Sequence, residues 1–274
     1  MRPILRELLG VEMMTVPAVV AHGGAGPGPD RQQNVEMAIK VAAEILKSGG
    51  SAIEAAVEAC VVLEDDPVFN AGTGGVFRND GSVSLDASIQ TSDGKIGFVI
   101  GMEETPNPIR VAKDLLDEEI NGLAGIGARI WADQRGHIKA PVEGRPPHGG
   151  EGDTVGVIAR DSNGLLASAT STGGTSHRPA GRVGDVPLPG SGFWADQKAS
   201  IAATGVGEAI TTALLSYRVH DRFTSSSSDL LSSMQWGISE LIEAGVSVGL
   251  IGLGPEGEGT GFSNTDMPWA AWSG

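Results

Sequence analysis

The stretch Gly152-Asp153-Thr154-Val155-Gly156-Val157 opens the part of the chain that decides the fold. Thr154 begins an apolar run that extends to residue 159, which predicts a buried strand. Residues 161–164 (DSNG) predict a turn, because Asn-Gly accepts positive φ angles. A second strand over 165–170 returns from this turn and leads into Ser171-Thr172-Gly173-Gly174. The sequence therefore predicts a hairpin that brings Thr154 and Thr172 together.

The loop after this hairpin adds two charged residues. Residues 181–185 (GRVGD) are rich in glycine and carry Arg182 and Asp185. Each residue has an ordinary explanation by itself, since threonine is common in strands and an arginine near an aspartate is usually a surface pair. Two threonines, an arginine and an aspartate within one hairpin and one loop instead favour a functional site.

The segment before Thr154 differs in kind from the strand that follows it. Residues 139–151 are polar and rich in proline and glycine, which is typical of an exposed, mobile linker. A linker that runs directly into a buried strand suggests that the chain is cut between Asp153 and Thr154. The new α-amine of Thr154, with a pKa of about 7.7–8.0, would then activate the hydroxyl of the same residue as a nucleophile.

Four motifs connect these residues with a known family. They are residues 152–157 (GDTVGV), 169–174 (ATSTGG), 179–187 (PAGRVGDVP) and 190–196 (GSGFWAD). Together they closely resemble the plant-type L-asparaginases and isoaspartyl peptidases. These enzymes are N-terminal-nucleophile hydrolases, related to glycosylasparaginases and taspases. The resemblance extends over nearly the whole chain, from His22 onward.

The resemblance implies both a fold and a processing step. The expected fold class is α/β, a four-layer α/β/β/α sandwich of the N-terminal-nucleophile hydrolase type, which agrees with the grouping of predicted strands and helices. Residues 15–274 would form one hydrolase domain after a short N-terminal extension, 1–14. Autocleavage at 153/154 would give an alpha subunit, 1–153, and a beta subunit, 154–274, that stay together.

The resemblance also implies roles for individual residues in the cleavage of a β-aspartyl amide. Thr154 would form an acyl-enzyme, with Thr172 tuning its hydroxyl. The substrate α-carboxylate would bind Arg182 and its α-ammonium would bind Asp185. Four further positions take part in the family: the Thr204 hydroxyl and the Gly205 N–H as the oxyanion hole, Asn70 near the nucleophile's amine, and Gly207 in substrate binding.

Residues 63–74 contain an acidic cluster that has two explanations from the residues alone, a metal site or a solvated turn. No cofactor is expected for catalysis. In the family this loop surrounds a structural sodium ion with main-chain carbonyl groups. The resemblance would assign those carbonyls to Leu63, Glu64, Asp66, Phe69, Ala71 and Thr73.

The substrate has several alternatives. The Asp153-Thr154 junction resembles glycosylasparaginases and taspases, whereas most asparaginases of the family have Gly-Thr. The chain is short, has no secretion signal and has no insertion for gripping a protein, which favours an isoaspartyl peptidase with asparaginase activity. The alternatives are an enzyme for glycosylated asparagine, a taspase-like protease, and an uncut, inactive homologue that binds an amino acid.

Composition excludes some partners. A net charge of −15 over 274 residues argues against nucleic-acid binding, which needs clustered lysine and arginine. No apolar run approaches ~20 residues, so we expect no membrane span and a cytoplasmic location. The single cysteine, Cys60, excludes an internal disulfide, and we expect it to pack in the core. The resemblance implies a homodimer of processed units.

The rest of the chain predicts conventional elements. His22 and Asp86 are expected to be structural, and Asn107 to cap a helix with Pro108 at its first position. Trp269 and Trp272 should pack at an edge. Periodicity predicts helices over 33–47, from a Ser51 cap onward, and over 127–134, 209–222 and 230–244, and strands over 16–21, 82–90, 94–101, 200–203, 246–253 and 259–264.

Overall fold

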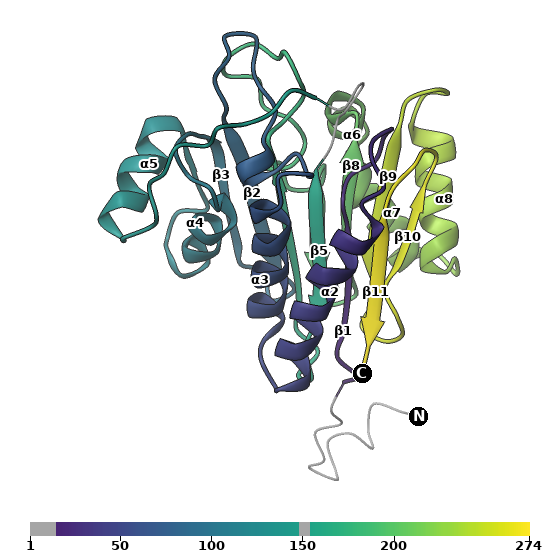
Figure 1. Ribbon diagram of the computed structural model, residues 1–274. Coiled ribbons are helices and arrows are strands. Elements are labelled where there is room, and N and C mark those ends of the chain that lie inside the picture. The colour runs from purple at the N-terminus through teal and green to yellow at the C-terminus, as the bar shows by residue number, and fades with distance from the viewer. Residues whose placement is uncertain (1–14, 148–153) are drawn as a thin grey trace.

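The computed structural model describes residues 15–147 and 154–274. The predicted N-terminal extension, 1–14, lies outside the described residues, as does Asp153 on one side of the expected cut. Within these ranges the protein is a mixed α/β structure with two sheets flanked by helices (Figure 1).

The larger sheet has seven strands in the order β11-β1-β5-β6-β2-β3-β4. The pairs are antiparallel except for β3 with β4. Its strands are β1 (Ala18–His22), β2 (Leu85–Thr91), β3 (Ile96–Met102), β4 (Gly122–Ala124), β5 (Val155–Arg160), β6 (Leu166–Thr172) and β11 (Trp269–Ser273). The predicted hairpin forms β5 and β6, which lie in the middle, while the two C-terminal tryptophans lie in the edge strand β11, as expected.

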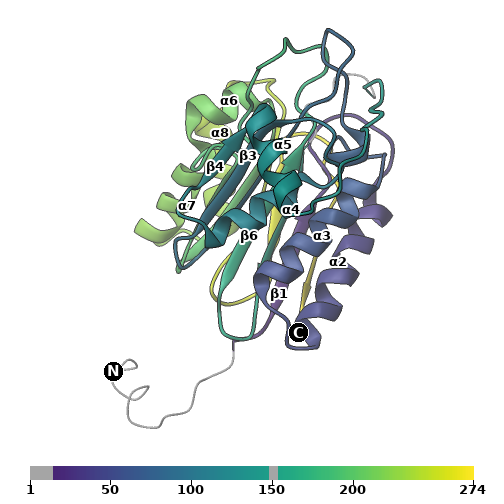
Figure 2. The same cartoon turned by 90° about the vertical axis from the view of Figure 1, so that its left-hand side faces the viewer.

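Helices from the N-terminal half cover one face of this sheet (Figure 2). They are α2 (Gln32–Lys47), α3 (Ala52–Asp65), α4 (Pro108–Asp114) and α5 (Gly125–Gln134), with single 3₁₀ turns η1 (Gly72–Gly74) and η2 (Leu115–Asp117). The predicted cap of α3 is confirmed, because the Ser51 hydroxyl accepts a hydrogen bond from the Glu54 N–H at 3.1 Å. Helix α3 contacts both β5 and β6 and so supports the central hairpin from behind.

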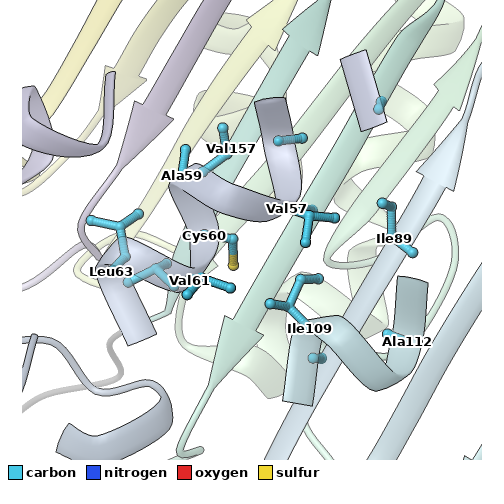
Figure 3. Close-up of a cluster of buried hydrophobic side chains, with 14 of the residues drawn as sticks. Val57, Ala59, Cys60, Val61, Leu63, Ile89, Ile109, Ala112 and Val157 are labelled. Atoms are coloured by element: carbon cyan, nitrogen blue, oxygen red, sulfur yellow. The ribbon is translucent and has the colours of Figure 1, made fainter. Parts of the chain in front are cut away.

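A large apolar core fills the space between these helices and the sheet. Figure 3 shows part of it, where Val57 and Val61 of α3 lie near Ile109 of α4 and Ile89 of β2. Cys60 is a free, fully buried thiol in the same cluster, which confirms its expected role in packing. This core joins one face of the larger sheet to the helices. The opposite face of the sheet packs against a second sheet.

The second sheet has four strands in the order β10-β9-β8-β7. They are β7 (Phe193–Asp196), β8 (Ala199–Gly205), β9 (Val248–Leu253) and β10 (Thr260–Ser263), and the helices of this half are α6 (Gly207–Ala213), α7 (Leu215–Ser225) and α8 (Leu230–Leu241). Helices α7 and α8 pack on the four-stranded sheet. No helix in the two described ranges is both long enough and apolar enough to cross a membrane.

The two sheets contact each other through a small apolar layer. Val20 and Ile158 of the larger sheet meet Ala202 and Ile251 of the smaller one, and all four are fully buried. Strands β5 and β6 contact β8 across this layer. The start of β5, the end of β6 and the end of β8 therefore come together at one end of the molecule, at the top of Figure 1.

One predicted helix proves to be two. Periodicity predicted a continuous helix over 209–222, but Leu214 adopts a left-handed conformation with φ 49° and separates α6 from α7. The reason is tertiary hydrogen bonding. The N–H groups of Ser216 and Tyr217 donate to the carbonyl oxygens of Ser191 and Gly190 instead of to the preceding turn of helix.

The cap predicted for α4 is also wrong. Pro108 does occupy the first turn, but the Asn107 side chain makes no capping hydrogen bond. Its amide instead donates to the Asp65 carboxylate at 2.8 Å, which links α4 to the end of α3.

We expect two glycine-to-alanine changes to shift stability in opposite directions. A Cβ on Gly156, in β5, would lie 2.4 Å from Nε2 of the fully buried His22, so G156A should lower the free energy of unfolding by about 1–3 kcal/mol. Gly127 is exposed in α5 with no atom within 4 Å of such a Cβ, so G127A should raise it by about 0.5–1 kcal/mol.

Thermal unfolding followed by circular dichroism, at one protein concentration, checks both variants. A melting temperature for G156A at or above that of the wild type would contradict the packing of His22 against β5.

Candidate active site

A small pocket lies where β5 begins and where β6 and β8 end. It is lined by residues from four separate stretches of the chain: Thr154, Thr172, Gly174, Thr175, Arg182, Gly184, Asp185, Gly205 and Gly207. The structure therefore brings together six of the residues that the sequence proposed for the site, with the hydroxyl, guanidinium and carboxyl groups facing one space.

Thr154 and Thr172 are neighbours across the β5–β6 ladder. Val155 pairs with Ser171 in this ladder, so the residues immediately before and after that pair are adjacent. Both threonines are 3% exposed. The Thr172 hydroxyl oxygen accepts a hydrogen bond from the Gly174 N–H at 2.9 Å, which orients that hydroxyl at the pocket.

His22 lies beside the nucleophile candidate but is not suited to be its base. Burial lowers the pKa of His22 to about 3, although the nearby backbone of Thr154 raises it slightly. Its Nδ1 accepts a hydrogen bond from the Gly24 N–H at 3.2 Å. The ring is thus neutral at pH 7 and serves the packing of β1 against β5, as the sequence predicted.

Arg182 presents a guanidinium whose orientation is set by a carboxylate. Its Nε and Nη2 each donate to Glu208 at 2.9 Å in a bidentate pair. The Arg182 side chain is 13% exposed and that of Glu208 is 67% exposed. Because Glu208 takes only one edge of the guanidinium, the edge formed by the two terminal nitrogens is left to face a ligand.

Asp185 brings a buried carboxyl group to the same pocket. Burial raises the pKa of Asp185 to about 7, while the charge of Arg182 lowers it. Its Oδ2 atom is buried and has no hydrogen-bond partner within the described part of the chain. An unpaired buried carboxyl oxygen is costly, so this atom is well suited to receive a cationic ligand.

The loop that carries Asp185 is held by buried hydroxyl groups. The Ser88 hydroxyl donates to the Val186 carbonyl at 2.7 Å and lies 2.6 Å from the Thr170 hydroxyl. The next carbonyl back, that of Asp185, accepts from the N–H groups of Leu188 and Gly192. These contacts fix the backbone on both sides of the carboxyl group.

Position 207 has no room for a side chain, because the charged groups of Asp185 and Arg182 lie directly beside it. A Cβ there would lie 2.7 Å from Oδ1 of Asp185 and 2.9 Å from Nη2 of Arg182. The same holds for Gly184, where a Cβ would lie 2.7 Å from Nη1 of Arg182. The two glycines therefore make room for the ion-binding side chains.

Thr204 and Gly205 end β8 at the pocket. Gly205 lines the pocket and has a φ of +127°, and a Cβ there would meet the Ser247 carbonyl oxygen at 2.3 Å. Thr204 is fully buried and does not line the pocket itself. Its hydroxyl oxygen has no hydrogen-bond partner among the described residues, so it remains available to a group bound next to Gly205.

Asn70 contacts the wall of the pocket instead of its interior. Its side-chain amide donates to the Gly174 carbonyl at 2.6 Å, and its oxygen accepts from the Val76 N–H at 3.0 Å. The residue is fully buried. The sequence placed Asn70 near the nucleophile's amine, and in the structure it reaches the segment that follows Thr172.

The loop predicted to hold sodium winds tightly from the end of α3 to η1. A Cβ on Gly72 would lie 2.4 Å from the Glu64 carbonyl oxygen, and a Cβ on Gly74 would lie 2.1 Å from that of Phe69. Several carbonyls of the set accept one hydrogen bond, as Glu64 does from the Thr73 hydroxyl at 2.9 Å. A carbonyl oxygen that accepts one hydrogen bond keeps a second lone pair, and oxygen ligands of this kind are the ones that hard cations take.

Side-chain metal sites are a separate matter. Within residues 15–147 and 154–274, no group of three or more histidine, cysteine, aspartate or glutamate side chains is placed to hold a metal ion.

Three pocket residues were not proposed from the sequence: Gly174, Thr175 and Gly184. All three lie inside or next to the motifs that carry the family resemblance, so proximity to Thr172 and Arg182 was the available signal. The predicted cleavage residue Asp153 lies outside the described residues.

Comparison with known proteins agrees with this geometry. The family model described as asparaginase matches residues 15–144 and 136–274. An isoaspartyl peptidase/L-asparaginase of Synechocystis is 32% identical over 88% of this chain and 83% of its own length. The Bos taurus protein of the same name is 34% identical, over 93% and 92%. A plant-type L-asparaginase of Pyrobaculum calidifontis is 33% identical, over 93% and 96%.

These matches span both sheets and all the pocket residues, with relatives of nearly the same length. The resemblance seen in the motifs is thus confirmed along the chain, and the protein belongs to the asparaginase family.

Proposed function

We propose that this protein is an isoaspartyl peptidase/L-asparaginase, an amidohydrolase that cleaves β-aspartyl amide bonds through Thr154. One observation carries the proposal: a single small pocket combines the Thr154 hydroxyl with a guanidinium and a buried carboxyl group. Arg182 and Asp185 match the two charges of a free amino-acid head group. The names of the relatives support the same class of substrate.

The proposal includes the fold type and the processing step. The two facing sheets with helices outside support a four-layer α/β/β/α sandwich of the N-terminal-nucleophile hydrolase type. The precursor is cut when the Thr154 hydroxyl attacks the Asp153 carbonyl carbon. This N-to-O shift breaks the Asp153–Thr154 amide bond, which frees the Thr154 α-amine and gives an ester on the Thr154 oxygen. Water then hydrolyses the ester, which restores the Thr154 hydroxyl and leaves the α-carboxylate of Asp153.

The processed enzyme uses the same hydroxyl on its substrate. The Thr154 α-amine takes the hydroxyl proton while the oxygen attacks the side-chain carbonyl carbon of the substrate. That proton passes to the leaving nitrogen, which departs as ammonia from asparagine or as the amino group of the second amino acid of a β-aspartyl dipeptide. Water then hydrolyses the aspartyl ester and restores Thr154. The Thr172 hydroxyl oxygen accepts from the Gly174 N–H, and in the proposed reaction the same hydroxyl would hydrogen-bond the nucleophile.

The negative charge that develops on the carbonyl oxygen is stabilised at the end of β8. The Thr204 hydroxyl is buried without a partner among the described residues, and Gly205 lines the pocket next to it. A donor of this kind gains strength in a site that excludes water, because it is already oriented before the charge appears.

Two further features of the family are part of the proposal. A sodium ion bound by carbonyls of the loop that ends in η1 would stabilise the segment carrying Asn70, and no step of the reaction passes through it. The processed units would assemble as homodimers. Neither feature alters the chemistry at Thr154.

A rate comparison on three substrates tests the proposed specificity. We expect the highest kcat/KM on β-aspartyl-leucine or asparagine and little activity on glycosylated asparagine. The Asp153-Thr154 junction is the feature that favours the alternative, so a clear preference for glycosylated asparagine would assign the protein to glycosylasparaginases. Blocking the substrate's α-amine should abolish turnover, because Asp185 would then lose its cationic partner.

Removing the nucleophile should stop both processing and turnover. We expect T154A to remain a single chain and to release no ammonia from asparagine, since alanine has no hydroxyl for either attack. T154S keeps the hydroxyl and the α-amine, so it should process and turn over more slowly than the wild type. Mass spectrometry of the intact protein and an ammonia assay give both results, and two fragments from T154A would contradict the proposal.

Acid should weaken substrate capture through Asp185. Its pKa is about 7 in the folded protein, so the carboxyl group becomes neutral as the pH falls through that value and loses its attraction for the ammonium group. The kcat/KM for asparagine should therefore fall as the pH is lowered from about 8 to about 6, with a rise in KM. In D185N the KM should be high at every pH in this range, and a KM for D185N that still rises in acid would assign the titration to another group.

A further inference from the structure

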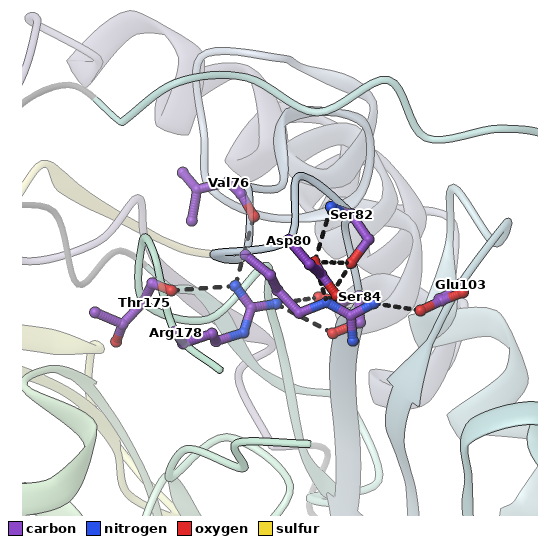
Figure 4. A network of polar contacts seen from close by, with 8 residues as sticks. Val76, Asp80, Ser82, Ser84, Glu103, Thr175 and Arg178 are labelled. Carbon is purple, nitrogen blue, oxygen red and sulfur yellow. Dashed lines mark hydrogen bonds and ion pairs between the residues drawn. The ribbon is translucent and has the colours of Figure 1, made fainter. Parts of the chain in front are cut away.

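Arg178 is a buried arginine directly behind the wall of the pocket. Its residue is 5% exposed, and its guanidinium donates to backbone carbonyls from three separate segments. Nη1 donates to Thr175 at 3.1 Å and to Val76 at 3.5 Å, and Nη2 donates to Ser84 at 2.7 Å. Figure 4 shows these contacts converging on the one side chain.

The same side chain lies against Gly174. A Cβ on Gly174 would be 2.7 Å from Nε of Arg178 and 2.8 Å from Cζ. Gly174 has a φ of +74°, a conformation that other residues rarely adopt. The guanidinium therefore packs on the backbone of a residue that lines the pocket, and the glycine allows that approach.

Gly174 in turn orients the hydroxyl next to the nucleophile. Its N–H donates to the Thr172 hydroxyl oxygen at 2.9 Å, and its carbonyl accepts from the Asn70 amide at 2.6 Å. Asn70 is itself tied to Val76, whose carbonyl also accepts from Arg178. The peptide groups around Gly174 are thus fixed by two buried side chains: Asn70 hydrogen-bonds the Gly174 carbonyl, and Arg178 hydrogen-bonds the Thr175 carbonyl.

We propose that Arg178 is a positioning residue, which fixes the Gly174–Thr175 backbone so that the Thr172 hydroxyl meets Thr154 in the geometry needed for attack. The inference rests on the proposed function of Thr154. It assigns to Arg178 an effect on the chemical step and not on binding, because Arg178 contacts the Gly174–Thr175 backbone, whereas the substrate head group would bind at Arg182 and Asp185.

Arginine suits this position better than lysine does. A guanidinium has five N–H donors in a planar fork, whereas an ammonium group is compact and cannot span three segments in one plane. Burial lowers the pKa of Arg178 to about 10, so the group stays protonated at pH 7. Asp86, buried in β2, supplies a nearby opposite charge, and its Oδ1 is oriented by the Gly101 N–H at 2.7 Å.

Arg129 offers a matched control. It is also a buried arginine, 6% exposed, and it also donates to backbone carbonyls, those of His137 and Glu104. It belongs to α5, and none of the residues to which it donates these hydrogen bonds lines the pocket. Loss of Arg129 should therefore lower stability without changing the geometry around Thr172.

The experiment compares R178A, R178K, R129A and wild type, with kcat expressed per processed Thr154 counted by mass spectrometry. A displacement of about 1 Å of a reacting group can cost about 100-fold in rate, so we expect kcat of R178A on asparagine to fall by about 10- to 100-fold. KM should stay within about threefold of wild type, since a change in kcat alone marks an interaction made at the transition state. R178K should recover part of the loss, and R129A should keep the wild-type kcat despite a lower melting temperature.

Each other outcome overturns the inference. A wild-type kcat in R178A would show that Arg178 has no effect on the chemical step, and a rise in KM without a fall in kcat would show that it acts on binding. An equal fall in kcat for R129A would show that Arg178 acts only through general stability. If R178A does not fold, R178K and R129K are compared by the same measurements, and equal kcat values overturn the inference. Wild type is assayed alongside, so the absence of any wild-type activity would instead reject the proposed function of Thr154.

Discussion

The backbone ladders on both sides of β5 hold Thr154 in place, and every other part of the site is arranged around that fixed point. β5 pairs with β1 along one edge and with β6 along the other. At its far end the fully buried Arg160 donates to the carbonyls of Val16, Gly254 and Gly257. A residue at the start of such a strand has little freedom to move, which is what a nucleophile needs if it is to meet a carbonyl carbon repeatedly in one orientation.

The two charged groups of the pocket are controlled in different ways, one by an ion pair and the other by burial. Arg182 is balanced by the exposed Glu208, while Asp185 is buried and keeps one oxygen without a partner in the described structure. The site therefore presents one cationic and one anionic group without neutralising them against each other. These two opposite charges are those that the proposed function pairs with the α-carboxylate and the α-ammonium of one amino-acid head group, in the pocket that Thr154 also lines.

Much of the site could be predicted because its residues are close together in the sequence. Thr154, Thr172, Arg182 and Asp185 fall within one hairpin and the loop after it, so strand alternation and turn residues were enough to associate them. Arg178 was not predicted, since its partners Ser84 and Val76 are 94 and 102 residues away and meet it only in the folded chain. The break at Leu214 was missed for the same reason, as the carbonyls that replace the helical bonds belong to residues 190–191. Strand β7 is short and half of its residues are only partly buried, so its pattern was too weak to predict a strand.

The strand order of the larger sheet has a consequence for how the enzyme must be made. β1 from the first half of the chain is inserted between β11 and β5 from the second half, and β6 of the second half borders β2 of the first. Neither half contains all the strands of the larger sheet, and parting them would open three of its ladders at once. Halves synthesised separately would each expose strand edges that invite pairing with other chains and aggregation. The proposed processing avoids that hazard, because a single precursor would fold first and would expose a free threonine end only once the neighbouring strands are in register.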